Sequence, residues 1–205
     1  MKRLLFYVTV LTVLSFSAMA QKTWVSFTSD IPGTPQVLVE EQDQSKVVLD
    51  ITISGMYIAE YAQEGRTFQR LELIQDRTTK DIGKPELPMI SELIGLPGNQ
   101  LVRVNILEKE TIKLSNYLVY PFQTPTTDNP GGQNKAFVMD QKFYSLPNTY
   151  PVNQVYMDQP GIWRDVKISG LHVVPFNYKT SSKELEVITH LRLEIEFYDT
   201  DPGFN

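Results

Sequence analysis

The side chains best suited to chemistry are two histidines, His172 and His190, and the chain contains no cysteine. Neither histidine has a second histidine or a cysteine to complete a metal site or a nucleophile–base pair. His190 falls on the polar side of an alternating run, which predicts a solvated surface side chain. The motifs GxSxG and GxGxxG and the Walker loop are missing from the sequence. We therefore predict a protein that is not an enzyme and that binds no metal and no cofactor.

Acidic residues form two further groups that could be mistaken for sites. Asp199 and Asp201 resemble the start of a calcium loop, but the later ligands and the closing glutamate are missing, so a turn is predicted. The second group lies along the polar face of a predicted strand, and no apolar pocket is evident that would raise the pKa of one carboxyl. We expect a solvated set that protects a sheet edge, not paired catalytic carboxylates. Its members are Glu184, Glu186, Glu194 and Glu196.

The composition is typical of a globular chain, with 41% hydrophobic and 21% charged residues among 205. The lack of cysteine excludes disulfide scaffolds, thiolate metal sites and cysteine nucleophiles. Lysine and arginine together number 19 and aspartate and glutamate 24, which gives a net charge of -5. Because nucleic-acid binding depends on basic side chains that neutralise phosphates, nucleic acid is not an expected partner.

The first 20 residues have the pattern of a secretory signal peptide. Lys2 and Arg3 precede an apolar run over residues 4–16, and small residues at positions 18 and 20 predict cleavage before Gln21. The apolar run is shorter than the roughly 20 residues that a membrane-spanning helix needs. We therefore expect residues 1–20 to be removed and the rest to be exported, periplasmic in transit and then extracellular or at the cell surface, with no membrane contact after cleavage.

The rest of the chain reads as many short strands. Residues 47–53 alternate and are rich in β-branched side chains, and residues 68–73 suggest a shorter strand. Residues 173–178 and 185–197 are predicted to form a hairpin through a turn at 179–183. Residues 101–107 and 112–119 read as a second hairpin, joined through the polar residues 108–110.

Prolines leave little room for helices. There are 13 of them, and only residues 89–95 could carry a short helical turn. Strands with frequent turn signals predict an all-β fold, an antiparallel β-sandwich or jelly-roll-like single domain over residues 21–198, with 199–205 as a C-terminal linker. The one long irregular stretch covers residues 121–141, and loops of this length are usually functional or disordered.

Two stretches are more specific than composition explains. Residues 82–91 read IGKPELPMIS, with a strand predicted shortly after them, and residues 156–166 read YMDQPGIWRDV, followed by VPFNY at 174–178 and the long strand at 185–197. In this order and spacing, from Val37 to Tyr198, they resemble the N-terminal propeptide of the gingipain-type secreted cysteine peptidases. Physical chemistry alone explains Gly83, Pro85 and Pro88 as a fixed turn and residues 164–165 as a local ion pair.

The resemblance implies a non-catalytic β-sandwich prodomain that assists folding of a cysteine peptidase and keeps it latent during type IX secretion. In that family an extended loop enters the active-site cleft in a substrate-like manner. Arginine-specific members carry a basic residue before an acidic-Asn-Pro turn, whereas this chain has Thr126 there. No Lys or Arg follows Arg192, so if a catalytic domain follows in the natural gene, the activation cut is expected beyond Asn205. The matching residues are Thr124, Pro125, Thr126, Thr127, Asp128 and Asn129, with Lys135 as the nearby basic side chain.

Two alternatives remain open. A stand-alone secreted β-sandwich for adhesion or glycan binding would need an exposed aromatic platform, for which the chain offers Trp24, Tyr144, Tyr150 and Tyr156. The chain could also be the N-terminal module of a type IX secretion sortase-like protein. The sequence leaves open the cognate peptidase, its specificity, whether a catalytic domain follows Asn205, and the oligomeric state.

Overall fold

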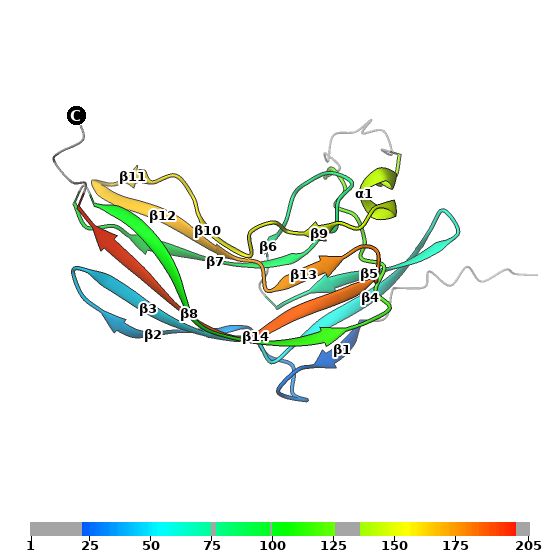
Figure 1. Cartoon of the computed structure of the whole chain (residues 1–205), viewed down its shortest axis with the longest axis horizontal. Helices are drawn as coiled ribbons and strands as arrows, with labels where there is room; N and C mark the ends of the chain where they lie inside the picture. The colour runs from blue at the N-terminus through cyan, green and yellow to red at the C-terminus, as the bar shows by residue number, and fades with distance from the viewer. Residues whose placement is uncertain (1–21, 75–76, 99, 126–135, 200–205) are drawn as a thin grey trace, which may run out of the picture.

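The computed structural model describes residues 22–74, 77–98, 100–125 and 136–199. Within them the regular secondary structure is almost entirely antiparallel β-sheet (Figure 1). The elements in chain order are β1 (Thr23–Ser26), β2 (Gln36–Gln42), β3 (Lys46–Thr52), β4 (Gly55–Gln63), β5 (Arg66–Glu72), β6 (Arg77–Thr78), β7 (Pro88–Gly95), β8 (Leu101–Leu114), α1 (Gln141–Ser145), β9 (Thr149–Tyr150), β10 (Val155–Met157), β11 (Gly161–Trp163), β12 (Val166–Val173), β13 (Phe176–Lys179) and β14 (Glu184–Tyr198).

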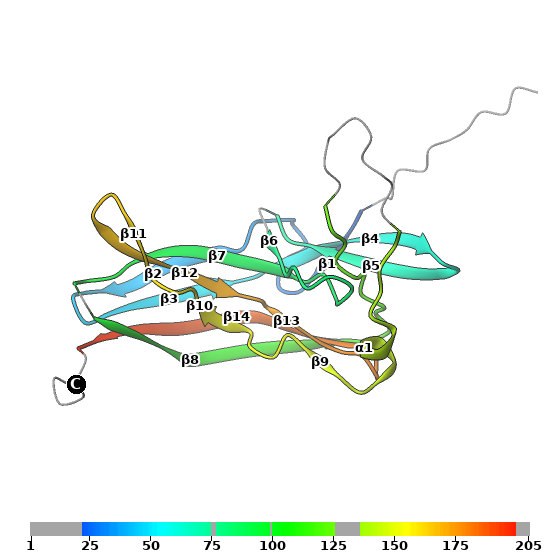
Figure 2. The same cartoon turned by 90° about the horizontal axis from the view of Figure 1, so that it is seen from above.

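The strands form three sheets that pack as an elongated, curved sandwich (Figures 1 and 2). One sheet has the order β2-β3-β14-β13-β9, with β8 also paired to β14. A second has the order β10-β12-β7-β6, with β11 also paired to β12, and faces the first at one end of the molecule. The third, β1-β4-β5, lies at the other end. The predicted all-β sandwich is therefore confirmed.

β14 is the central strand of the core. Its odd-numbered residues from Leu185 to Phe197 are all buried, while its even-numbered residues are mostly only partly buried. This confirms the alternation predicted from the sequence, and the hairpin of β13 with β14 has the predicted position, with Phe176 opposite Val187. Strands β3 and β5 also lie where short strands were predicted.

The predicted hairpin over residues 101–119 is wrong. β8 is one continuous strand of 14 residues, and it pairs with β14 from Leu114 opposite Leu185 to Leu101 opposite Tyr198. Residues 108–110 contain no turn-forming Gly, Pro, Asn or Asp. They stay in the strand because β14 offers partners, and the Glu108 carboxylate lies 3.7 Å from Arg192.

Two further expectations are corrected by the sheet arrangement. Residues 89–95 belong to strand β7, which is paired with β12, and the helix in the described part of the chain is α1. The acidic residues of β14 do not protect an edge, because β14 is paired on both sides; Glu184 instead bonds Lys179 at 2.7 Å, and Glu196 lies 3.4 Å from Arg103. No helix among the described residues is long and apolar enough to cross a bilayer.

His172 connects three strands of one sheet. It is 8% exposed, and its Nδ1 lies 2.9 Å from the hydroxyl of Ser91 on β7. Its Nε2 lies 2.8 Å from Asp158, which follows β10, and the ring of Tyr156 on β10 packs against it at 5.0 Å. Gly170 makes room for this arrangement, since a Cβ there would lie 2.7 Å from Asp158 Oδ2. The contacts tie the edge strand β10 to the sheet interior.

His190 was predicted to be a solvated surface side chain, and this is wrong. Its side chain is 25% exposed, and its Nε2 lies 2.6 Å from Asp50 Oδ2 on the neighbouring strand β3. The hydrogen bond to Asp50 raises the pKa of His190 above its ordinary value, partial burial opposes this, and the Asp50 charge adds to it. The register of β14 against β3, which the sequence does not reveal, brings the two side chains together.

The raised pKa of His190 predicts a pH-dependent contribution to stability. The bond to Asp50 favours protonated His190 in the folded state. The contribution of this bond to the free energy of unfolding is therefore fully present below the pKa of histidine in the unfolded chain, about 6.5, and is lost as pH rises through the raised pKa of the folded state. Urea unfolding of the wild-type chain and of His190→Gln should therefore show a larger wild-type advantage at pH 5.5 than at pH 8.5. An advantage that is the same at both pH values would contradict this assignment.

Candidate functional site

The structure describes the base of the predicted inhibitory loop. We call residues 121–125 the outgoing leg and residues 136–140 the returning leg; both stand on the same side of the molecule in Figure 1, beside α1. Thr124 and Pro125 are exposed at the end of the outgoing leg. The other predicted site residues lie outside the described residues. These are Thr126, Thr127, Asp128, Asn129 and Lys135.

Gly83 joins the two legs through its backbone. Its N–H donates to the carbonyl of Phe122 at 2.9 Å, and its carbonyl accepts from the N–H of Asp140 at 2.9 Å. Phe122 N–H in turn donates to the carbonyl of Lys84 at 2.8 Å. Gly83 has φ of 78°, and a Cβ on it would lie 3.0 Å from Asp140 N. The predicted turn is present at Gly83. Gly83 lies between the two legs and is hydrogen-bonded to both of them.

Gln123 forms a second connection between the legs. Its Nε2 donates to the carbonyls of Pro121 and Val138, each at 2.8 Å. Its Oε1 accepts from Val138 N–H at 2.8 Å, so both polar ends of one amide are bonded. A glutamine in a loop carries no distinctive sequence signal, so this role could not be predicted from the sequence.

Aromatic packing holds the returning leg on the sandwich. The ring of Phe137 lies 5.6 Å from Phe68 and 5.8 Å from Tyr120, and Tyr61 lies 5.5 Å from Tyr120. Phe68 on β5 is fully buried, so the leg is packed against the core. A cavity of about 270 Å³ remains between the legs. Its lining residues are Gln63, Tyr120, Gln123, Thr124, Ala136, Phe137 and Val138.

Helix α1 fixes the end of the returning leg. The carboxylate of Asp140 caps its N-terminus by accepting from Phe143 N–H at 2.9 Å. The hydroxyl of Tyr144 donates to the carbonyl of Val119, just before the outgoing leg, at 2.8 Å. Burial raises the pKa of Tyr144, so this donor keeps its proton at any physiological pH. The two legs are thus hydrogen-bonded to each other and packed against the sandwich.

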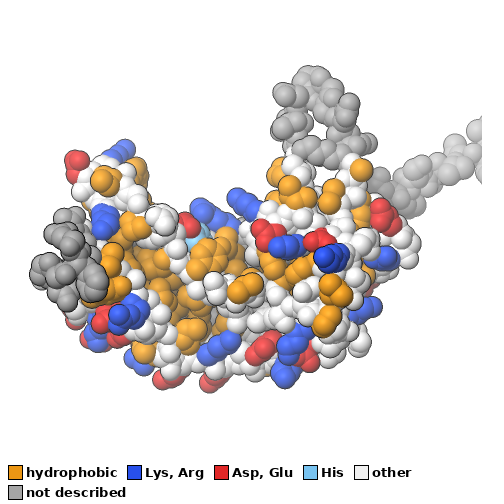
Figure 3. Space-filling view, turned by 45° about the horizontal axis from the view of Figure 1, so that its top comes forward, with side chains coloured by type: hydrophobic (Ala, Val, Ile, Leu, Met, Phe, Trp, Pro, Cys, Tyr) orange, Lys and Arg blue, Asp and Glu red, His pale blue; other side chains and the backbone are white. Residues whose placement is uncertain are grey.

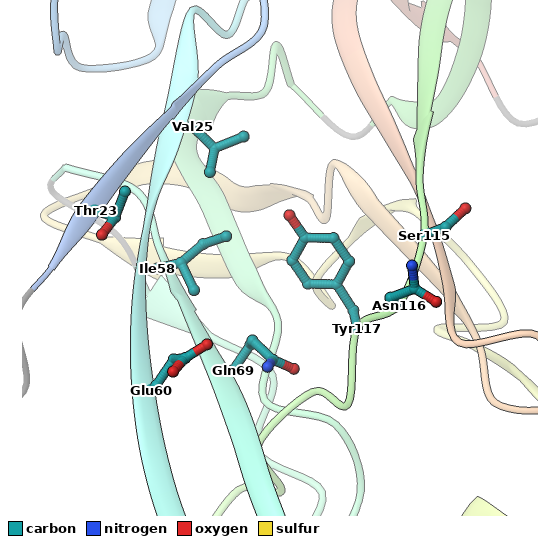
Figure 4. A pocket seen from close by; sticks show the side chains of 8 residues that line it. All are labelled: Thr23, Val25, Ile58, Glu60, Gln69, Ser115, Asn116 and Tyr117. Carbon is teal, nitrogen blue, oxygen red and sulfur yellow. The ribbon is translucent and has the colours of Figure 1, made fainter.

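A second cavity, of about 660 Å³, lies between the sheet of β1, β4 and β5 and residues 115–117. Figure 4 shows the ring of Tyr117 pointing into it, with Val25 and Ile58 on the opposite wall. Among the described residues that line it, Glu60 is the one carboxylate, and there is no histidine to act with it as a base. No group of three or more His, Asp and Glu side chains within the described ranges could hold a metal ion.

The four aromatic residues considered for a glycan platform do not lie on one surface. Trp24 packs against Tyr57 at 5.1 Å, and its indole donates to the carbonyl of Ser29. Tyr150 is buried and, like Tyr144, packs against Phe143 near α1. Tyr156 lies on His172 in another sheet. The structure therefore places these residues in separate packing contacts.

Gly83→Ala should weaken the base of the loop. We expect it to lower the free energy of unfolding by about 2–3 kcal/mol, since a non-glycine residue at positive φ costs about 1–2 kcal/mol and the Cβ also crowds Asp140 N. Gly65→Ala is the matched control, because Gly65 has φ of 71° but nothing within 4 Å of an added Cβ. Urea unfolding measures both losses. Equal losses for the two variants would show that crowding at Gly83 is unimportant.

The comparisons with curated proteins point to one group of relatives. The chain is 23% identical over 143 residues to Lys-gingipain of Porphyromonas gingivalis, which covers 67% of this chain and 8% of the relative. It is 22% identical over 185 residues to gingipain R1 of the same organism, which covers 90% of this chain and 18% of the relative. The chain therefore spans less than a fifth of the length of these curated relatives.

Solved structures and a family model complete the comparison. A structure reported as giving insight into zymogenic latency of gingipain K from P. gingivalis matches with a TM-score of 0.75 and 19% identity, over 88% of this chain and all of that one. A complex of P. gingivalis RgpB pro- and mature domains matches with a TM-score of 0.72 and 18% identity, over 84% and 93%. These show the same fold. The family model Propeptide_C25 matches residues 28–204, and the chain therefore belongs to the Propeptide_C25 family.

Proposed function

We propose that this chain is an exported, non-catalytic prodomain that assists folding of a gingipain-type cysteine peptidase and keeps it latent. The loop over residues 124–135 enters the active-site cleft of the peptidase. One structural observation carries the proposal: Gly83 and Gln123 connect both legs of this loop to each other at the surface of a rigid sandwich. The matching structures of gingipain K latency and of RgpB pro- and mature domains support the choice of partner.

The bonded base lowers the cost of binding. A free loop loses conformational entropy when its ends are fixed and again when it enters a cleft. Here the ends are already fixed at Gln123 and Val138, and Pro125 and Pro130 restrict the backbone between them. Since only the cost of ordering the loop itself remains, more of the contact energy appears as affinity for the peptidase.

Lys135 supplies the basic side chain of the inhibitory loop. It is the only lysine or arginine between Pro121 and Gln141. A peptidase that prefers substrates with a basic residue before the cut needs an acidic specificity pocket. The positive charge of Lys135 is complementary to such a pocket, whereas Thr126 carries no charge. In this proposal the segment from Thr126 to Asn129 lies along the cleft, and Lys135 enters the pocket.

Export follows from the N-terminal pattern. Residues 1–20 act as a signal peptide, residues 21–198 form the prodomain, and residues 199–205 form a linker. N-terminal sequencing of the protein recovered from the periplasm of an expressing bacterium should begin at Gln21. Recovery of the uncleaved chain in the membrane fraction would contradict this assignment.

Inhibition of purified gingipain-type peptidases by residues 21–205 tests the proposal. We expect an inhibition constant on the order of 1–100 nM for the cognate peptidase, as is common for inhibitor interfaces of standard size. Replacement of residues 124–135 by a Gly/Ser linker of equal length should weaken inhibition at least about 100-fold, because the cleft contacts are lost. Lys135→Ala should weaken it at least about 10-fold.

Lys142→Ala is the matched control for Lys135→Ala. Lys142 is an exposed lysine on α1, outside the loop, so its removal changes the same charge without changing the loop. It should leave the inhibition constant unchanged within about twofold. A folded wild-type chain that inhibits no such peptidase would contradict the proposal and favour an adhesion or secretion module. Equal inhibition by the wild-type and loop-replaced chains would place the inhibitory surface elsewhere.

A further inference from the structure

The hairpin of β11 and β12 carries an apolar tip that the core does not use. Ile162 is 82% exposed, Trp163 57% and Val166 52%, and none belongs to the buried core. Trp163 lies opposite Val166 across the hairpin. The guanidinium of Arg164 lies 5.4 Å from the centre of the Trp163 ring, so the predicted ion pair of Arg164 with Asp165 is replaced by a cation–π contact. We call these four residues, Ile162, Trp163, Arg164 and Val166, the hairpin tip.

The tip is built at a cost to stability. Arg164 and Asp165 occupy the turn with φ of 47° and 67°, a conformation in which hairpin turns favour Asn and Gly. Three large apolar side chains beside this turn remain in water. Tryptophan and arginine are also the residue types most enriched among those that dominate binding energy at protein interfaces. Exposed apolar residues on a strained, projecting turn are therefore typical of a protein-binding contact.

The hairpin tip and the loop legs project on the same side of the molecule. Figure 1 shows them at opposite ends of its upper side, and Figure 3 shows hydrophobic side chains gathered in the hollow between them. Two cavities lie beside the hairpin of β11 and β12. One, of about 450 Å³, is lined by Gly98, Pro160, Gly161, Ile162, Asp165 and Lys167. The other, of about 270 Å³, shares Pro160 and Lys167 and adds Leu101, Val102, Met157 and Tyr198.

The separation of the two projections fits a globular domain. β14 runs most of the length of the molecule with 15 residues, so at about 3.3 Å per residue that length is about 50 Å. A domain of about 250 residues has a radius of gyration of about 18 Å and hence a diameter of about 46 Å. A domain of this size that holds the loop can also reach the hairpin tip, whereas a small molecule in contact with one projection cannot reach the other.

We propose that the hairpin tip is a second docking contact for the same peptidase domain whose cleft receives the loop. This inference rests on the proposed function, which supplies the partner. The loop occupies the cleft, while Trp163 and Ile162 bind an apolar depression on the outer surface of the peptidase, away from the catalytic residues. The contact slows dissociation without touching the reacting groups, so it adds affinity to any loop sequence.

The double variant Ile162→Ser/Trp163→Ala tests the inference, with inhibition and dissociation kinetics measured on the full chain against a gingipain-type peptidase. We expect the inhibition constant to rise at least about 10-fold, chiefly through faster dissociation. Ile31→Ser is the matched control, since Ile31 is 78% exposed and belongs to the segment joining β1 to β2 on the opposite side of the molecule. It should leave both quantities unchanged.

The outcomes separate this inference from the proposed function. Suppose that the wild-type chain inhibits and the loop-replaced chain does not. An inhibition constant of the double variant equal to that of the wild type then overturns the hairpin contact alone. A wild-type chain that does not bind the peptidase overturns both. If the double variant fails to fold, a photo-crosslinking residue at position 163 or position 31 answers instead. A crosslink to the peptidase from position 163 but not from position 31 supports the contact. The absence of a crosslink from position 163 overturns it.

Discussion

Two backbone hydrogen bonds at Gly83 join the two legs of the loop that we propose to be inhibitory. One reaches Phe122 on the outgoing leg and the other reaches Asp140 on the returning leg, both at 2.9 Å. A residue with a Cβ would be strained there, because the backbone has positive φ and Asp140 N is 3.0 Å from where a Cβ would stand. The contacts of Gln123, Phe137 and α1 add to a base that Gly83 has already closed. The loop therefore begins and ends at fixed points on the sandwich.

The fold could be predicted where the signal is local. β14 alternates along most of its length between apolar buried and polar partly buried residues, and its turn to β13 is polar, so both were found from the sequence. β8 was misread as a hairpin because the charged residues 108–110 interrupt its pattern, while its actual partner lies more than 70 residues away along the chain. Residues 89–95 were misread because their strand pattern is weak and their pairing with β12 is equally distant.

The site could be predicted only in part. The family motif led to residues 82–91 and to the loop, but residues 126–129 and Lys135 lie outside the described residues. The contacts of Gly83 with Asp140 and of Phe137 with Phe68 join residues 57 and 69 positions apart, and no periodicity encodes them. The bonds of His172 to Ser91 and of His190 to Asp50 were missed for the same reason. Long-range register decides which polar side chains meet, and a single sequence does not contain it.

The most direct test of the account is an experimental structure of this chain bound to its cognate gingipain-type peptidase. We predict that residues 126–129 lie in the active-site cleft, that the Lys135 side chain lies in the specificity pocket, and that the hydrogen bonds of Gly83 and Gln123 are retained. A complex in which the cleft is empty, or is filled by another part of the chain, would contradict the central claim that a rigid sandwich presents this loop as the inhibitory element.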